Sequence, residues 1–167
     1  MTMKTGHKWI LVRIDGKIAA LSTDYRQLAR ISSTLAKGSD TKLYEKITAT
    51  VIGSEEVWKL KQETTWDDLM LFGTEFQKKV WRKLWELTQP ETDGPQRDRT
   101  INLICYSDFA ELCQNRAGVR AVAHAIGLNP ISVIIPCHLV IPKESIDKIR
   151  NIQKKAEATI FKGDDLC

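Results

Sequence analysis

Long apolar runs are missing from this chain, and their absence excludes one large class of proteins. A membrane-spanning helix needs about 20 consecutive apolar residues, and no apolar stretch among the 167 residues approaches that length. The first seven residues are polar and lack the apolar core of a secretory signal. We therefore expect a cytoplasmic protein that does not associate with membranes.

Paired cysteines are missing too. The four cysteines are Cys105, Cys113, Cys137 and Cys167, and no two of them form a Cys-x-x-Cys pair. Because nothing in the sequence indicates secretion, thiols are favoured over disulfides. A zinc site made by Cys137, His138 and His124 is conceivable, but these residues lack the ligand spacing of zinc motifs. We expect no metal.

A strongly basic segment is also missing. The net charge is +4, and residues 1–70 carry 11 basic and 9 acidic side chains while the rest of the chain carries 14 and 12. Because phosphate neutralisation usually dominates the affinity for nucleic acid, this balance predicts modest, salt-sensitive binding. The densest basic cluster comprises Lys78, Lys79, Arg82 and Lys83. A solvated helix face explains this cluster at least as well as a binding surface does.

The most informative stretch that the chain does contain is a cysteine followed directly by a histidine. An apolar run, Ile131–Ile135, leads into Pro136-Cys137-His138 and predicts a buried strand that ends at the cysteine. A free thiol has a pKa of about 8.5 and is mostly protonated at neutral pH, whereas the thiolate is the nucleophile. A neighbouring imidazole can accept the thiol proton, directly or through a water molecule. The alternative without a catalytic role is an inert core cysteine beside a surface histidine.

Two helices joined by a tight turn are predicted upstream of this cysteine. The first begins near Tyr106, with Ser107 or Asp108 as its N-cap, and the second covers residues 117–127. Small residues leave the second helix shallow, and Arg120 is its long basic side chain. Such a helix can approach a nucleic-acid backbone closely, or it can pack tightly on another helix. The pair is a helix-turn-helix candidate.

Five sequence blocks, in this order, resemble the 6-O-methylguanine-DNA methyltransferases, the methylated-DNA–protein-cysteine methyltransferases. The blocks are Gly73-Thr74-Glu75-Phe76-Gln77-Lys78-Lys79-Val80-Trp81, Tyr106, Arg120-Ala121-Val122, Asn129-Pro130 and Pro136-Cys137-His138-Leu139-Val140. The resemblance extends from Met70 to Ile141 and is poor elsewhere. It implies a mixed α/β fold, in which a small N-terminal sheet-plus-helix domain precedes a helical, winged-helix-like DNA-binding domain.

The resemblance also implies a single-turnover repair reaction. Cys137 would take an alkyl group from the 6-oxygen of a guanine in DNA and would never be regenerated. His138 resembles the base that deprotonates this thiol through water. Asn129 resembles the hinge residue that joins the recognition helix to the active-site strand. The transfer requires no metal or organic cofactor.

The same resemblance assigns residues to DNA and to the extruded base. Arg120 and Ala121 lie on the helix that enters the minor groove in this family, and the arginine fills the gap left by the flipped nucleotide. Tyr106 crowds the target phosphate and hydrogen-bonds the extruded base. Backbone groups around Cys137 and Val140 would read the guanine edge. The implied partner is double-stranded DNA with an alkylated guanine, bound by a monomer.

Three departures from the family pattern bear on this prediction. Leu139 stands where the family has an arginine, which removes a polar contact. Residues 143–162 contain no glycine and predict a helix, whereas the family has a glycine-rich loop and then a glutamate that orients the histidine. Asp164 or Asp165 would have to replace that glutamate. A polar loop at residues 90–99 stands in place of a short turn.

These departures keep a second function open. It is a lesion-recognition or regulatory protein of the alkyltransferase-like type, with weak or no transfer activity. The presence of a cysteine at position 137 argues against it. A thiol hydrolase is disfavoured, because the sequence shows neither an oxyanion-donor pattern nor a separate catalytic histidine. The leading prediction is direct repair of alkylated guanine.

The first part of the chain is predicted from local patterns. Two apolar runs flank Asp15-Gly16, which predicts a β-hairpin. A helix is expected at Tyr25–Leu35, and strands are expected at Ile47–Ile52 and Val57–Leu60.

A domain boundary is expected just before the family block begins. The N-terminal α/β domain would comprise residues 1–70, and the alkyltransferase-like domain residues 71–167. Thr74 and Gln77 predict a capping box at the start of the next helix. Trp81 and Trp85 on that helix are expected to pack in the core or between domains rather than to stack on bases.

Overall fold

The structure is a computed structural model that describes residues 7–24, 26, 28–30, 33, 46–89 and 103–164, without the side chains of residues 159–164. The chain forms two compact units. One comprises Met1–Thr92 and His124–Cys137, and the other comprises Asp93–Ala123 and His138–Cys167. Cys137 and His138 are adjacent in the chain but belong to different units. The predicted domain boundary between residues 70 and 71 stays a prediction.

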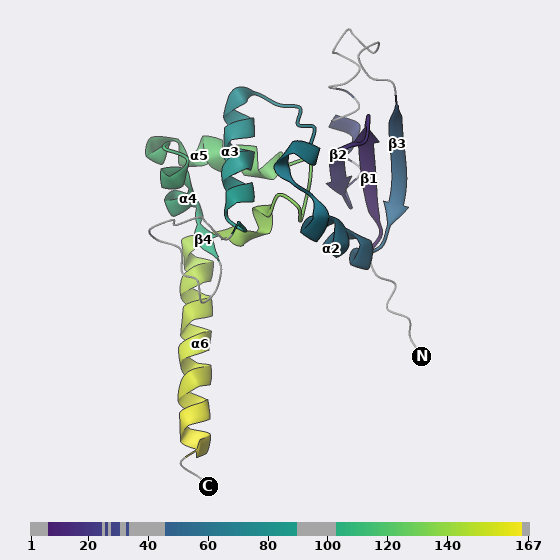
Figure 1. Cartoon of the computed structure of the whole chain (residues 1–167). Helices are drawn as coiled ribbons and strands as arrows, with labels where there is room; N and C mark the ends of the chain where they lie inside the picture. Colours follow the sequence, from purple (N-terminus) through teal and green to yellow (C-terminus); the bar gives the residue numbers. More distant parts are fainter. Residues whose placement is uncertain are drawn as a thin grey trace, which may run out of the picture. The chain divides into compact units, whose positions relative to one another are not determined.

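A three-stranded antiparallel sheet begins the first unit (Figure 1). Strand β1 (Trp9–Ile14) lies in the middle, between β2 (Lys17–Ser22) and β3 (Ile47–Ile52). Asp15 and Gly16 have φ angles of 50° and 83°, which is the left-handed backbone that a primed two-residue hairpin turn requires. The hairpin and the strand at 47–52 are therefore confirmed.

A helix occupies the place of the other predicted strand. Helix α2 (Ser54–Glu63) contains residues 57–60, so the strand prediction there is wrong. Val57 is buried and Leu60 is half-buried, and their spacing of three residues places them on one helix face. Acidic residues in the first turn and Lys61 in the last turn suit the helix dipole. A four-residue apolar pattern is too short to distinguish a strand from a helix.

Two further predicted segments lie partly or wholly outside the described residues. Of the predicted helix at 25–35, residues 26, 28–30 and 33 are described and are helical. The predicted loop at 90–99 lies outside the described residues altogether.

Helix α3 (Glu75–Glu86) follows a short 3-10 helix, η2 (Trp66–Asp68), and begins at the predicted capping box. The Thr74 hydroxyl oxygen accepts a hydrogen bond from the Gln77 backbone N–H at 3.1 Å, and Gln77 Oε1 accepts one from the Thr74 N–H at 3.0 Å. The capping box is therefore confirmed. The buried side chains of this helix are Val80, Trp81, Leu84 and Trp85, which confirms the expected core packing of both tryptophans.

The Trp81 ring leaves no room for a side chain at Gly73. A Cβ added at this position would lie 2.7 Å from Cη2 of the Trp81 ring. The Trp81 ring is 2 % exposed and cannot readily move away. The close packing of ring on backbone therefore requires a residue without a side chain here.

The second unit contains a short parallel pair of strands. Strand β4 (Ile104–Cys105) pairs with β5 (Val140–Ile141), with Ile104 opposite Val140 and Cys105 opposite Ile141. Helix α4 (Tyr106–Leu112) follows β4 without a break. The N-cap of α4 is Cys105, so the prediction of Ser107 or Asp108 as the cap is wrong. The helix starts earlier than expected because its first residue continues directly from the paired strand.

The predicted helix-turn-helix is confirmed. A 3-10 turn, η3 (Arg116–Gly118), leads from α4 into α5 (Val119–Gly127). The turn is closed by the Asn115 backbone N–H, which donates to the Ala110 carbonyl oxygen at 2.9 Å, and by the Gly118 N–H, which donates to the Asn115 carbonyl oxygen at 3.0 Å.

A long helix, α6 (Lys143–Asp164), follows β5 after one residue (Figure 1). The helix predicted from the apolar spacing of the tail is thus confirmed. Its apolar stripe is buried at the start, where Ile146 is 4 % exposed, and open further along, where Ile152 is 66 % exposed. Across the described residues, no helix is both long enough and apolar enough to cross a membrane.

Candidate active site

The segment that leads to the cysteine is a buried loop and not the predicted strand. Ile131, Ile134 and Ile135 are at most 1 % exposed, but Val133 has a φ of 71° and the chain turns there. The Ile135 N–H donates to the Ile131 carbonyl oxygen at 3.0 Å, which closes the turn. The strand prediction is therefore wrong, because an apolar run shows that a segment is buried without showing that it is extended.

The N-terminal sheet holds one end of this loop. The Leu21 N–H on β2 donates to the Pro130 carbonyl oxygen at 3.0 Å, and the Ser132 N–H donates to the Leu21 carbonyl oxygen at 2.9 Å. The edge of the sheet thereby continues into the loop before the cysteine. The sequence analysis missed this role of Leu21, and no local signal could have shown it, because the two partners are more than a hundred residues apart.

Asn129 joins the two ends of the loop. Its side-chain Nδ2 donates to the Ile135 carbonyl oxygen at 2.8 Å, and its Oδ1 accepts from the Ile131 N–H at 3.0 Å. The residue is 1 % exposed, so these bonds also satisfy a buried polar group. Asn129 therefore fixes the chain immediately before Pro136 and Cys137.

Cys137 begins a 3-10 turn, η4 (Cys137–Leu139), at the end of this loop. Its backbone N–H donates to the Ile135 carbonyl oxygen at 2.8 Å. Of the described cysteines, Cys105 and Cys113 are buried, whereas Cys137 is a half-buried free thiol. The next residue, His138, is exposed. This cysteine therefore has the partial access to solvent that a reacting thiol needs.

The pairing of β4 with β5 positions Tyr106 and Val140 in the second unit. Tyr106 is the first residue of α4 and is half-buried, and it follows the strand whose partner begins at Val140. The pairing with Ile104 fixes the backbone of Val140. The residue itself is buried, with 3 % of its surface exposed.

Helix α5 presents different faces to the core and to solvent. Val122 is fully buried, whereas Arg120 and Ala121 are exposed. Because Ala121 is small, the Arg120 side chain projects from a shallow helix surface, as the sequence predicts. His124 is also exposed.

The departures from the family pattern have clear structural counterparts. Leu139 is 8 % exposed, so an apolar side chain suits this position. Helix α6 follows the motif directly in place of a glycine-rich loop. Asp164 is the last residue of that helix, and Asp165 lies outside the described residues. The acid that would orient His138 stays a prediction.

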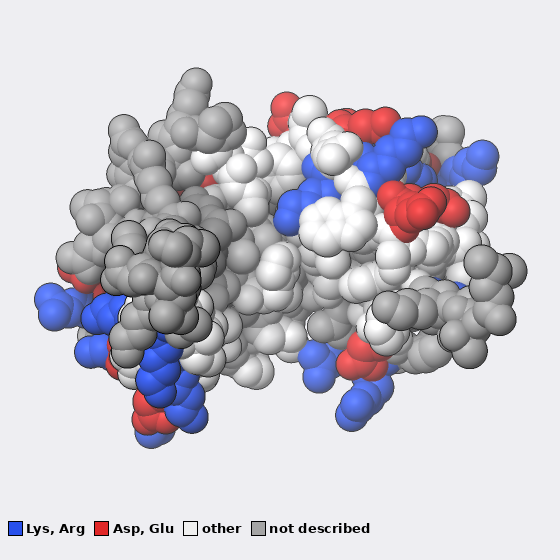
Figure 2. Space-filling view, turned by 90° about the horizontal axis from the view of Figure 1, so that it is seen from below, with Lys and Arg blue, Asp and Glu red and all other residues white. Residues whose placement is uncertain are grey.

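Charges are mixed over the surface. Figure 2 shows acidic and basic side chains in small, interspersed groups on the face that it presents. Within the described part of the chain, no three His, Cys, Asp or Glu side chains are grouped to hold a metal ion. The alternative of a zinc site at Cys137, His138 and His124 therefore gains no support.

A helix-turn-helix with an exposed arginine, followed by an asparagine-held loop with an accessible thiol, defines a helix-turn-helix protein that carries a candidate reactive cysteine. Residues 100–158 match the family described as the 6-O-methylguanine DNA methyltransferase, DNA binding domain. Over this segment the chain is similar to that family, and the resemblance predicted from the sequence is confirmed.

Two curated proteins illustrate the similarity. One is the "Probable methylated-DNA--protein-cysteine methyltransferase" of Acanthamoeba polyphaga mimivirus, 46 % identical over 78 residues, which are 47 % of this chain and 45 % of that protein. The other is the methylated-DNA–protein-cysteine methyltransferase of Methanosarcina mazei, 45 % identical over 69 residues, which are 41 % and 37 % of the two chains. The matched segment thus spans less than half the length of these relatives.

A solved structure extends the comparison to most of the chain. It is the O6-methylguanine-DNA methyltransferase of Pyrococcus kodakaraensis strain KOD1, with a TM-score of 0.50 and 23 % identity over 86 % of this chain and 83 % of that one. At this identity the likeness concerns the fold alone. The predicted mixed α/β class is confirmed.

Proposed function

We propose that this protein repairs DNA by transferring an alkyl group directly from the 6-oxygen of guanine to Cys137. The observation that carries the proposal is the state of this thiol. Cys137 is the half-buried one of the described cysteines, and Asn129 fixes the loop before it through two hydrogen bonds. The similarity of residues 100–158 to the methyltransferase DNA-binding domain supports the same reaction.

The proposed chemistry is one displacement. His138 accepts the thiol proton, directly or through water, and the thiolate sulfur forms a bond to the alkyl carbon. The bond between this carbon and the guanine oxygen breaks, and its electron pair stays on the oxygen. The guanine then takes up one proton. Because the new carbon–sulfur bond is not cleaved, each molecule reacts once.

The substrate proposed is double-stranded DNA with an alkylated guanine. The reacting oxygen is hidden in the base stack, so the nucleotide must leave the duplex, which costs a few kcal/mol and least for a damaged pair. Arg120 and Ala121 on the exposed face of α5 would enter the minor groove, with the arginine in the gap. Tyr106 would hold the extruded nucleotide, and the backbone at Val140 would read the base.

A sensor without efficient transfer is the second candidate. The observation that favours it is the start of helix α6 at Lys143, where the related methyltransferases have a glycine-rich loop that closes over the lesion. Leu139 in place of the family's arginine is a second departure. Such a protein would retain the DNA-binding helix but would transfer the alkyl group slowly or not at all.

One experiment separates the two. The protein is incubated with a duplex that contains 6-O-methylguanine and is then digested, and the peptide containing Cys137 is weighed. We expect one added methyl group, absent in Cys137→Ala and retained in Cys167→Ala, which removes a different thiol. Tight, lesion-selective binding of the same duplex without the added mass would establish the sensor instead.

A further inference from the structure

Two clefts lie side by side in the first unit, away from the residues assigned to repair. One has a volume of about 730 Å³ and runs between the end of α2 and the end of α3. The other has a volume of about 540 Å³ and lies along the start of α3. Trp66 and Arg82 line both of them, so these two side chains form a wall that the clefts share.

Two indole rings of the clefts each contact a cation. The Arg82 guanidinium carbon lies 4.8 Å from the ring centroid of Trp66, and the Lys61 ammonium lies 5.4 Å from that of Trp58. Trp66 also contacts Trp85, with ring centroids 5.9 Å apart and an angle of 57° between the planes. Trp58 is 56 % exposed, although it is a large aromatic residue.

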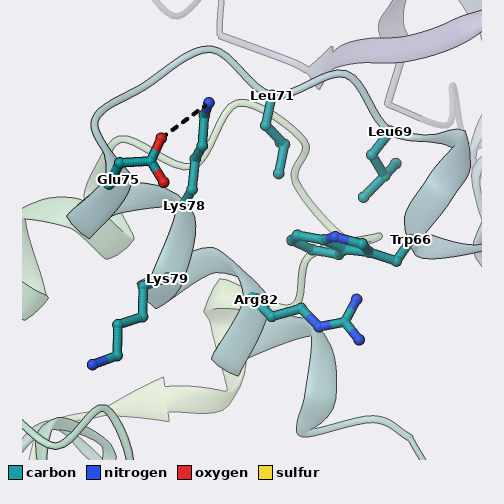
Figure 3. A pocket seen from close by; sticks show the side chains of 7 residues that line it. All are labelled: Trp66, Leu69, Leu71, Glu75, Lys78, Lys79 and Arg82. Atoms are coloured by element: carbon teal, nitrogen blue, oxygen red, sulfur yellow. Dashed lines mark ion pairs between the residues drawn. The ribbon is translucent and has the colours of Figure 1, made fainter.

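Figure 3 shows the smaller cleft from close by. The Trp66 ring lies between the Arg82 side chain on one side and Leu69 and Leu71 on the other. Lys78 points toward Glu75, with which it forms an ion pair at 3.8 Å. Lys79 extends away from the indole. Apolar and cationic surfaces therefore meet around one aromatic ring.

The cations of the clefts are incompletely balanced. Glu75 pairs with Lys78, and Glu86 pairs with both Arg82 and Lys83, at 3.3 Å and 3.2 Å. Glu63 also lines the larger cleft, but no ion pair joins it to Lys61. Among the described residues, Lys61 and Lys79 have no ion-pair partner. Burial lowers the pKa of Lys61, because its ammonium loses water without gaining a carboxylate. An anionic ligand would supply the missing partner for both lysines.

We propose that these clefts bind a short unpaired stretch of nucleic acid. A base face would stack on the exposed Trp58 ring, and backbone phosphates would pair with Lys61 and Lys79. Aromatic platforms beside free cations are the usual features of sequence-tolerant binding to single strands. Paired bases in a duplex offer no free face to an indole. An acidic peptide would satisfy the lysines but would leave the exposed Trp58 ring without a matching planar group.

The proposal is independent of alkyl transfer and is tested with a fluorescein-labelled oligothymidylate about eight nucleotides long. The test variant is Lys61→Gln/Lys79→Gln. The matched control, Lys8→Gln/Lys59→Gln, removes two exposed lysines of the same unit that line neither cleft. Fluorescence anisotropy at several salt concentrations should show roughly tenfold weaker binding for the test variant, and a salt slope reduced by about 1.4, which is two phosphate contacts. The control should bind like the native protein.

The position of the strand is tested by photocrosslinking with 5-bromouracil in the same oligonucleotide. We expect crosslinks in peptides that contain Trp58 or Trp66, and their loss in Trp58→Leu. Crosslinks confined to residues 103–127, equal affinity of the two double variants, or full displacement by a polyglutamate peptide would overturn the proposal. If the native protein transfers methyl groups, methyl transfer to Cys137 by the test variant serves as the folding control. If it does not, the circular dichroism spectrum of the variant serves instead.

Discussion

The indole N–H of Trp81 on α3 donates a 2.9 Å hydrogen bond to the backbone carbonyl oxygen of Ala125 on α5. Both groups are buried, and the residues are 44 positions apart in the chain. This bond ties the helix of the Gly-Thr block to the last turns of the helix whose earlier residues include Arg120. Its strength should therefore affect the stability of the first unit, to which both residues belong.

Replacing Trp81 by phenylalanine should lower the free energy of unfolding by about 1–3 kcal/mol, because the buried ring becomes smaller and the Ala125 carbonyl keeps only the 3.2 Å hydrogen bond from the Leu128 N–H. Urea denaturation measures the change. The control is Trp58→Phe, which alters an exposed ring and should stay within about 0.5 kcal/mol of the native protein. Equal effects of the two substitutions would contradict the importance of the hydrogen bond.

Replacing Gly73 by alanine should also be destabilising, by about 1–3 kcal/mol, because the added methyl group would lie 2.7 Å from the Trp81 ring. The Gly127→Ala variant offers a contrast. A Cβ at Gly127 meets nothing within 4 Å, and alanine is the better helix former, so this change should be neutral or slightly stabilising. Thermal denaturation of both variants tests the difference, and a neutral Gly73→Ala would show that the ring can shift.

Replacing Asn129 by alanine should cost about 2–4 kcal/mol, since the buried Ile131 N–H loses its acceptor and the Ile135 carbonyl keeps only the hydrogen bond from the Cys137 N–H. Because the loop positions Cys137, the rate of methyl transfer should fall further than the loss of folded protein explains. The control, Asn151→Ala, removes an exposed amide on α6. Rates are measured by single-turnover transfer at a temperature where both variants remain folded. A rate that falls only in proportion to the folded fraction would argue against a positioning role for Asn129.

Thiol-specific alkylation should distinguish Cys137 from the buried cysteines. Under native conditions, iodoacetamide should modify Cys137 well before Cys105 or Cys113, which are 5 % and 1 % exposed. Peptide mass spectrometry over a time course gives the order, and denaturant should abolish it. Similar rates of modification of the three cysteines in the native protein would contradict the greater accessibility of Cys137.

The carboxyl of Asp68 should contribute to stability in a pH-dependent way. Hydrogen bonds from the backbone and then the hydroxyl of Thr65 hold the pKa of Asp68 below its ordinary value of 3.8. A lowered pKa in the folded state means that this stabilisation is present above pH 3.8 and is lost as the pH falls through the folded value. In Asp68→Asn, the urea midpoint should therefore depend less on pH in this acid range than it does in the native protein, and an unchanged pH dependence would contradict the prediction.

Local chemistry made several features predictable. Asp15-Gly16 predicts the hairpin, because these residue types tolerate the left-handed backbone that the turn requires. Thr74 and Gln77 predict the start of α3, because their side chains bond to each other's backbone. Residues 57–60 were mispredicted since four residues carry too little periodicity, and the loop at 131–135 was mispredicted since its shape depends on Asn129 and Leu21.

The order of the family blocks, the adjacency of Cys137 and His138, and the local turns and caps can be predicted from the chain alone, because each depends on neighbouring residues. Only the tertiary structure decided which thiol is accessible and how its loop is held, because burial and long-range hydrogen bonds join distant residues. The same reason applies to the clefts at Trp66. Their lining residues come from separate helices, and only folding brings unpaired lysines and indole rings to one surface.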